Sequence, residues 1–177
     1  MPKVLGMDPS KARTGWALME PNRTLLEVGS FRSESIRDFA VNASALIARH
    51  EPDFFVYERA LEYIVIYDKR ALVKGIVTPN ADQIILWKID GWLEGWSTMS
   101  GIEYLRVAPA TWRAAVFGEG GGKLDRERAK KKAKEHCRLC GYAVKNHDAA
   151  EAVCIAEYGL STAEFRFGVL QSGPPGQ

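Results

Sequence analysis

Two stretches decide the fold of this chain: Val4-Leu5-Gly6-Met7-Asp8-Pro9-Ser10 and Asn146-His147-Asp148-Ala149-Ala150-Glu151-Ala152. Each places carboxylates at the edge of what reads as a packed element. Between them, Phe54-Phe55-Val56-Tyr57-Glu58 closes another apolar run with a carboxylate. Hard cations such as Mg²⁺ take oxygen ligands, and two of them can act on both sides of an in-line phosphoryl displacement. The sequence therefore predicts a catalytic metal site made of Asp8, Glu58, Asp148 and Glu151.

A structural explanation is open for the last two acids. Asp148 and Glu151 are three residues apart, so on a helix they face the same way. An acid at a helix N-cap followed three residues later by Glu is also a capping box, which only starts a helix. Spacing alone does not separate this interpretation from a metal site.

Length and composition indicate one globular domain over residues 1–165, followed by a tail at 166–177 whose composition is typical of disorder. Apolar residues make up 46% and charged residues 26% of the chain, which is ordinary for a globular protein. No apolar run approaches the roughly 18 residues of a membrane span, and the N-terminus lacks the apolar stretch of a signal peptide. We expect a cytoplasmic protein that does not bind membranes.

The cysteines do not indicate a disulfide framework or a metal site. They are three in number, an odd count that is consistent with a reducing compartment. Cys137 and Cys140 have the spacing of a zinc knuckle, but no second pair completes four ligands, and His136 adjoins Cys137 rather than standing at ligand spacing.

Hydrophobic patterning predicts an α/β domain with a mixed five-stranded sheet flanked by helices. The expected strands are 3–7, 15–19, 25–31, 53–58 and 104–107. The expected helices are one that begins at Ser33 or Ser35, then 81–99, 109–117, a basic helix that ends near 139, and 148–160. Residues 59–80 are expected to form a long surface connection that is partly helical.

This arrangement gives the acids a physical reason to meet. Asp8 follows the first strand and Glu58 follows a strand expected to run parallel to it, and neighbouring strands are about 4.8 Å apart. The final helix then has only to dock its first turn there to bring Asp148 and Glu151. Four carboxylates in one cleft would repel one another unless cations were bound, so a purely structural cluster would be costly.

These residues, in this order, resemble the RuvC-type Holliday junction resolvases of the ribonuclease H-like superfamily. The first block of the resemblance is Gly6 to Ser10 with Thr14 to Ala17, and the second is Tyr57-Glu58. The remaining blocks are Asn80 to Gln83 with the Gly91 helix, Pro109 to Arg113 with Gly118 to Gly120 and Lys123, and Asp148 to Ala152. The resemblance spans about residues 4–160.

The resemblance implies a crossover junction endodeoxyribonuclease that resolves four-way DNA junctions by symmetric nicking. It implies two Mg²⁺ ions per active site, which Mn²⁺ can replace, and a homodimer, since a four-way junction is two-fold symmetric. Branched DNA is then the partner, and the cytoplasm of a bacterial or phage-infected cell is the compartment.

Two features depart from the family pattern. The last acid is Glu151 where the cellular enzymes usually have Asp, which changes the reach of the side chain. The stretch 59–79 is longer than in compact members and is similar in this respect to phage-borne ones. That stretch normally enters the junction, and Tyr63 and Tyr67 are its candidate DNA contacts.

A basic run supplies further candidate DNA contacts. Seven of the 24 Lys and Arg residues lie between positions 123 and 134. The glycines before Lys123 do not form a phosphate-binding P-loop, because Leu124 stands where that motif needs Ser or Thr. A charge run is commonly only a solvated helix face. Beside a metal site we favour phosphate contact. The candidates are Lys123, Arg126, Lys130 and Arg113.

Two other functions stay open at this stage. Another ribonuclease H-like nuclease, acting on flaps, branched DNA or RNA–DNA hybrids, would use the same acids. A non-catalytic junction-binding protein would keep the fold without needing them.

Overall fold

The computed structural model describes residues 1–61, 65–66, 75–76, 81–162 and 165. Its strands are β1 (Val4–Asp8), β2 (Arg13–Met19), β3 (Leu25–Arg32), β4 (Phe54–Glu58), β5 (Val65–Ile66), β6 (Gly75–Ile76) and β7 (Glu103–Val107). Its helices are α1 (Ile36–His50), α2 (Ala81–Ser100), α3 (Pro109–Phe117), the short 3₁₀ turn η1 (Gly121–Lys123), α4 (Arg126–Leu139) and α5 (His147–Ser161).

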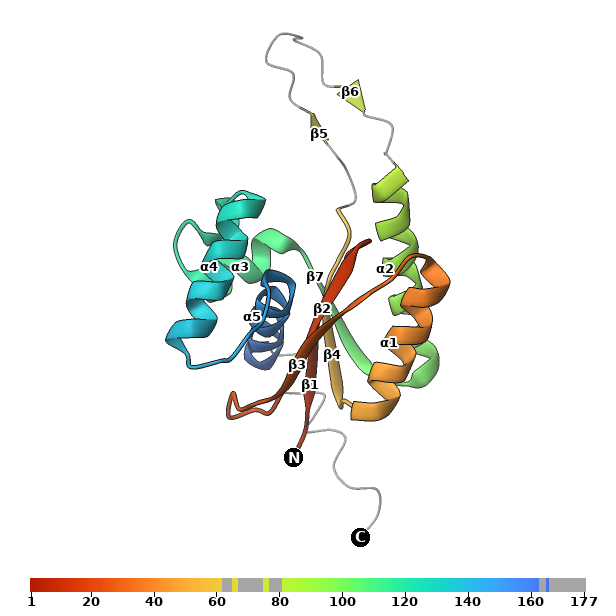
Figure 1. Ribbon diagram of the computed structural model, residues 1–177, viewed down its shortest axis with the longest axis horizontal. Coiled ribbons are helices and arrows are strands. Elements are labelled where there is room, and N and C mark those ends of the chain that lie inside the picture. The colour runs from red at the N-terminus through yellow and green to blue at the C-terminus, as the bar shows by residue number, and fades with distance from the viewer. Residues whose placement is uncertain (62–64, 67–74, 77–80, 163–164, 166–177) are drawn as a thin grey trace.

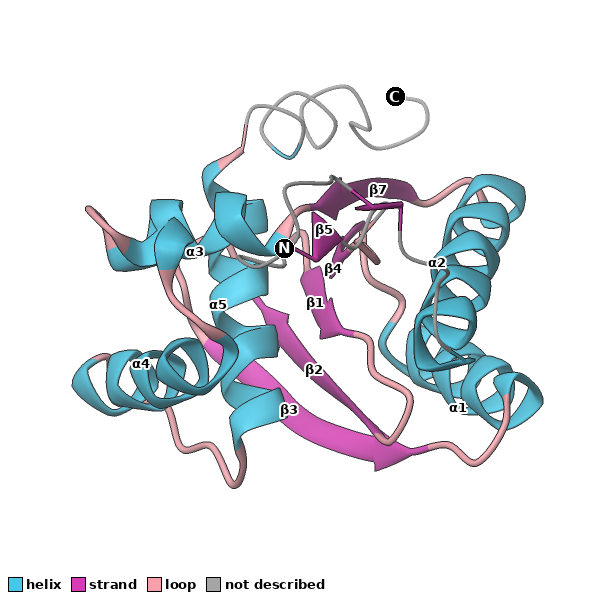
Figure 2. Ribbon diagram, turned by 90° about the horizontal axis from the view of Figure 1, so that it is seen from above, coloured by secondary structure: helices cyan, strands magenta, loops and turns pink. Residues whose placement is uncertain are grey.

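A mixed five-stranded sheet forms the centre of the molecule, in the order β3-β2-β1-β4-β7. The first three strands form an antiparallel meander, whereas β4 and β7 each run parallel to their inner neighbour. Helices α1 and α2 cover one face of the sheet, and α3, α4 and α5 lie on the other (Figures 1 and 2). The expected fold class is confirmed.

Alternation along the strands divides the apolar side chains between the two faces. Val4 of β1 and Val56 of β4 belong to the core beneath α5, whereas Leu5 and Tyr57 belong to the core beneath α1 and α2. This follows from the two-residue period of a strand. Helix α5 is buried along almost its whole length because it lies between the sheet and α4.

Two glycines let α5 come unusually close to the sheet. A β-carbon on Gly6 would lie 2.5 Å from the carbonyl oxygen of Ala152, and one on Gly15 would lie 2.0 Å from that of Asp148. Such distances are well inside van der Waals contact, so only glycine permits this packing. The start of α5 is thereby held against β1 and β2.

Most expected elements agree with the structure to within two residues at each end. Ser35 is the N-cap of α1, where its side chain accepts a hydrogen bond from the backbone N–H of Asp38. Within 59–80 the described pairs Val65–Ile66 and Gly75–Ile76 form an antiparallel ladder, and most of the stretch expected to be partly helical lies outside the described residues. The proposed tail at 166–177 lies outside the described residues.

No helix in the described part of the chain combines the length and the apolar character needed to cross a membrane.

Candidate metal-dependent active site

Asp8 and Glu58 stand side by side at the ends of two neighbouring parallel strands. Met7 of β1 is in register with Tyr57 of β4, so the next residue of each strand is one of the two acids. Met7 and Tyr57 point into the core beneath α1 and α2. By strand alternation the acids point to the opposite face, the one that α5 covers.

The first turns of α5 bring the other two acids to the same place. Asn146, not Asp148, is the N-cap of α5, and its side-chain oxygen accepts from the N–H of Ala149 at 2.9 Å. The Asn146 amide also donates to Ser30 Oγ in β3 at 3.0 Å, which fixes the start of the helix on the sheet. The capping-box explanation for Asp148 and Glu151 is therefore wrong: both lie inside the helix.

Three of the predicted acids converge closely enough to share a cation. One carboxylate oxygen each from Asp8, Asp148 and Glu151 lies within 4.8 Å of the other two. Glu151 is buried and Asp148 is partly exposed, so the group is open to solvent on one side. Glu58 lies against this group, and its charge acts directly on Asp8.

The pKa values of Asp8 and Glu151 are raised because the carboxylates are buried close to one another. Burial raises the pKa of Asp8 well above its ordinary value, and the carboxylates of Glu58, Glu151 and Asp148 raise it further. Burial, followed by the charge of Glu58, raises the pKa of Glu151 to about 7. Negative charge at this site is therefore unfavourable without a positive partner.

Two residues of α3 supply part of that compensation. Trp112 is fully buried and its indole Nε1–H donates to Glu58 Oε2 at 2.6 Å. Arg113 Nη2 lies 3.4 Å from Glu151 Oε1 and 3.9 Å from Glu58 Oε2. Burial raises the pKa of Glu58, while the Trp112 hydrogen bond and the charge of Arg113 act to lower it.

Arg113 was expected among the DNA contacts, and the structure places it inside the acidic site with its side chain 14% exposed. Trp112 was not among the predicted site residues. Trp112 lies three residues after the first residue of α3, Pro109, and nothing in that position indicates a contact with Glu58. The contact depends on how α3 packs against the rest of the protein.

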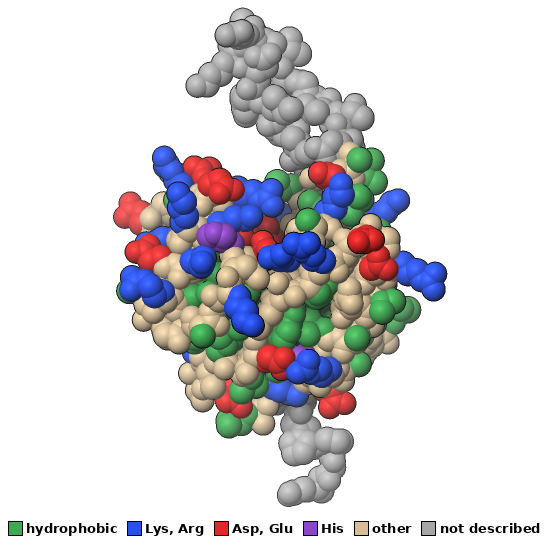
Figure 3. Space-filling view, viewed as in Figure 1, with side chains coloured by type: hydrophobic (Ala, Val, Ile, Leu, Met, Phe, Trp, Pro, Cys, Tyr) green, Lys and Arg blue, Asp and Glu red, His purple; other side chains and the backbone are tan. Residues whose placement is uncertain are grey.

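Three of the basic candidates lie on α4 or on the η1 turn before it. Lys123 at the end of η1 and Arg126 at the start of α4 are exposed. Lys130 is partly buried, and its Nζ lies 4.0 Å from Asp148 Oδ1. Figure 3 shows Lys and Arg side chains gathered over this part of the face, with acidic side chains recessed between them. Tyr63 and Tyr67 lie outside the described residues.

The donor set fits a hard divalent cation. All the converging donors are carboxylate oxygens, which Mg²⁺ and Mn²⁺ prefer, and no thiol or imidazole is among them. The mutual repulsion of these carboxylates is what a bound cation would relieve.

Comparison with known proteins places the fold. No protein-family model and no curated protein matches the sequence. Among solved structures, RuvC of Thermus thermophilus in complex with a Holliday junction substrate is 14% identical, with a TM-score of 0.63, over 94% of this chain and 96% of that one. A second T. thermophilus RuvC structure is 16% identical, with a TM-score of 0.60, over 94% and 96%. The Holliday junction resolvase of fowlpox virus is 12% identical, with a TM-score of 0.55, over 89% and 97%.

These identities are low, and the likeness establishes the fold. The chain has the ribonuclease H-like fold of the RuvC-type resolvases over most of its length, as the resemblance in the sequence led us to expect.

Proposed function

We propose that this chain is a RuvC-type endonuclease that resolves four-way DNA junctions in a reaction dependent on divalent cations. The observation that carries the proposal is the convergence of Asp8, Asp148 and Glu151, with Glu58 beside them, at one end of the sheet. The structures that share this fold include resolvases solved with a Holliday junction.

Asp8, Glu58, Asp148 and Glu151 would hold Mg²⁺, with Mn²⁺ as a substitute. When two such ions are bound, they supply charge stabilisation for the attacking water and for the leaving 3′ oxygen. The protein forms no covalent bond with DNA in this scheme. Cleavage leaves 5′-phosphate and 3′-hydroxyl ends.

The neighbouring side chains orient the acids. The Trp112 N–H donates to Oε2 of Glu58, which leaves Oε1 of that acid available to a cation. Arg113 holds Glu151 and approaches Glu58, so it spans the β4 and α5 parts of the site. A ligand that is already hydrogen-bonded loses less conformational freedom when a cation binds. Mutation of the residues that form these hydrogen bonds commonly lowers metal affinity or activity.

The basic residues near α4 bind the DNA backbone. Lys123 and Arg126 are exposed, and the charge of Arg126 reaches Glu58 closely enough to lower the pKa of that acid. Cationic groups so close to the acids can hold a phosphate next to the cations without reading sequence. Arg113 and Lys130 contribute charge at the base of the same site.

A homodimer is the active species. A four-way junction is two-fold symmetric, and nicking two opposed strands requires two active sites related by the same symmetry. The cytoplasm of a bacterial or phage-infected cell is where such junctions would be met. The apolar surface of α2 supports association, since Trp87 remains 37% exposed.

The test is a panel of end-labelled substrates incubated with the purified chain in Mg²⁺: a mobile four-way junction, a flap, a linear duplex and an RNA–DNA hybrid. The proposal predicts paired nicks at symmetric positions on the junction, with little cutting of the duplex. Preferred cutting of the flap or the hybrid would assign a different nuclease to the same acids. Junction binding without cleavage in either Mg²⁺ or Mn²⁺ would make the chain a binding protein.

A further inference from the structure

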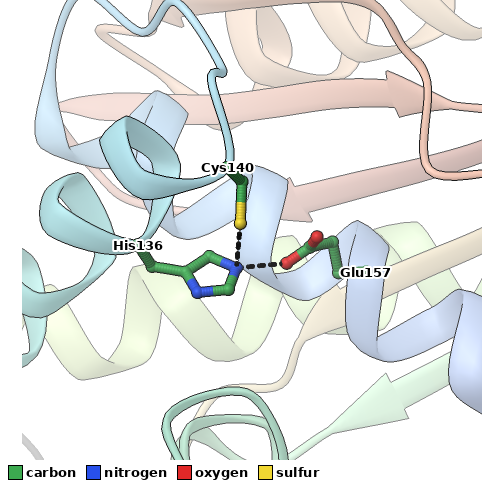
Figure 4. A group of neighbouring side chains, drawn as sticks. All are labelled: His136, Cys140 and Glu157. Atoms are coloured by element: carbon green, nitrogen blue, oxygen red, sulfur yellow. Dashed lines mark hydrogen bonds and ion pairs between the residues drawn. The ribbon is translucent and has the colours of Figure 1, made fainter.

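A second cluster of ligand-type side chains joins α4 to α5 away from the acidic site. His136 and Cys140 stand four residues apart near the end of α4, so they share one face of that helix. Glu157 faces them from α5, and one donor atom of each residue lies within 4.8 Å of the other two. Figure 4 shows all three side chains directed toward a common point.

The donor atoms of the three side chains lie close to one another. His136 Nε2 lies 2.5 Å from Glu157 Oε2 and 3.7 Å from Cys140 Sγ. Around a tetrahedral Zn²⁺, bond lengths of about 2.0–2.3 Å put an N and an S ligand about 3.6 Å apart, and an N and an O ligand about 3.4 Å apart. The sulfur–nitrogen spacing already suits the metal, and the carboxylate has to withdraw by less than about 1 Å.

The carboxylate is already oriented by a further side chain. Gly141 follows α4 with a φ of 78°, a left-handed conformation that turns the chain back toward α5. Tyr142 can then place its hydroxyl 3.1 Å from Glu157 Oε1, which leaves Oε2 to face His136. Glu157 is only 5% exposed, and hydrogen bonds of this kind commonly fix metal ligands.

A nitrogen, a sulfur and an oxygen donor form a set that differs from that of the acidic site. Mg²⁺ has little affinity for thiolate or imidazole, whereas Zn²⁺ and Co²⁺ accept all three donors. An ion pair between His136 and Glu157 needs no thiol, so the aligned Cys140 sulfur is what points to a metal. The sulfur is also reachable, because Cys140 is exposed whereas Cys137 and Cys154 are buried.

We propose that His136, Cys140 and Glu157 form a zinc site with an open fourth position for water. Cys140 binds as thiolate and releases its proton to solvent, and His136 binds through Nε2. The site is independent of the proposed nuclease activity. Zinc bound at this site would join α4, which carries Arg126 and Lys130, to α5, which carries Asp148 and Glu151.

Cobalt substitution tests the site directly. The full chain, stripped with chelator, is titrated with Co²⁺ and its near-ultraviolet absorption is recorded for thiolate-to-cobalt charge transfer. We expect the band in the wild type and in Asp8→Asn, since the acidic site holds no sulfur, and we expect Zn²⁺ to remove it. We expect the loss of the band in Cys140→Ser, a replacement that leaves the core intact because Cys140 is exposed. Circular dichroism in chelator checks the fold of each variant.

Two further measurements test Zn²⁺ binding at this site independently of cobalt. Zn²⁺ should protect the exposed Cys140 thiol from a thiol reagent in the wild type, and Tyr142→Phe should weaken Zn²⁺ binding by about 10- to 100-fold. Absence of the cobalt band in the wild type, or a band of equal strength in Cys140→Ser, would reduce the cluster to an ion pair that joins two helices.

Discussion

Replacing Glu151 by Gln should stabilise the metal-free protein while removing a proposed metal ligand. Burial and the charge of Glu58 raise the pKa of Glu151 from 4.5 to about 7. Between these two pH values the folded protein binds more protons than the unfolded chain, so its stability falls as the pH rises. At pH 8 the cost of ionising Glu151 is about 3 kcal/mol, and at pH 5 it is under about 1 kcal/mol.

The neutral amide does not carry this cost. For a chain of this size, about 3 kcal/mol corresponds to a rise in Tm of roughly 6–12 °C at pH 8, and the rise should shrink severalfold at pH 5. Thermal unfolding in chelator at both pH values measures it. Addition of Mg²⁺ at pH 8 should raise the Tm of the wild type more than that of Glu151→Gln, because the cation relieves the same repulsion.

Glu103→Gln is the matched control for this change. Glu103 is an exposed acid at the start of β7, so the same chemical replacement there should shift Tm by no more than about 1–2 °C at either pH. The reasoning is refuted if Glu151→Gln lowers the Tm at pH 8, or raises it equally at pH 5 and pH 8.

Three further substitutions test the orientation of Glu58, the contact with DNA and the packing of α5 on the sheet, one each. Trp112→Phe removes the hydrogen bond to Glu58 and should lower junction turnover about 10- to 100-fold, with binding unchanged in a gel-shift assay. Lys123→Ala should weaken binding and make the salt dependence of log Kd shallower by about one unit. Gly15→Ala forces a β-carbon against the Asp148 carbonyl, so urea unfolding should show a loss of about 1–3 kcal/mol or more.

Controls for these changes come from positions away from the site. Arg37→Ala on the exposed face of α1 should leave the salt dependence unaltered; an equal effect there would mean that Lys123 has no special role. Gly95→Ala in α2, where an added β-carbon meets nothing within 4 Å, should not destabilise the chain. Normal turnover in Trp112→Phe would show that Glu58 does not depend on its hydrogen bond.

The strand pattern was sufficient to predict half of the candidate site. The apolar runs 4–7 and 54–57 predict two buried strands that each end in an acid, and the structure places Asp8 and Glu58 at the ends of adjacent parallel strands. The agreement arises because a short apolar run that ends in an acid is a local property of the chain.

The position of α5 against the sheet was harder to predict from the sequence. Asn146 and Asp148 are both good N-cap residues, and the structure shows that Asn146 starts the helix: its side chain accepts from the Ala149 N–H and donates to Ser30 in β3. Likewise, Gly6 and Gly15 read as ordinary strand glycines until α5 lies against them.

Contacts between separate elements were the hardest to foresee. The Trp112 hydrogen bond to Glu58 joins residues 54 positions apart, and the approach of Glu157 to His136 joins α5 to α4. In the sequence, no second cysteine pair accompanies Cys137 and Cys140. The structure places Cys140 beside His136, one helical turn earlier, and beside Glu157 of α5, a neighbour that the sequence does not indicate.

The most direct test of the central claim compares the wild type with Asp8→Asn on one labelled mobile junction. Both proteins are assayed for binding without added metal and for cleavage in Mg²⁺. The account predicts that Asp8→Asn binds the junction as tightly as the wild type or more tightly, because a negative charge near the DNA is lost, and that it does not cut it. Cleavage of the junction by Asp8→Asn at the wild-type rate in Mg²⁺ would contradict a catalytic role for the converging acids.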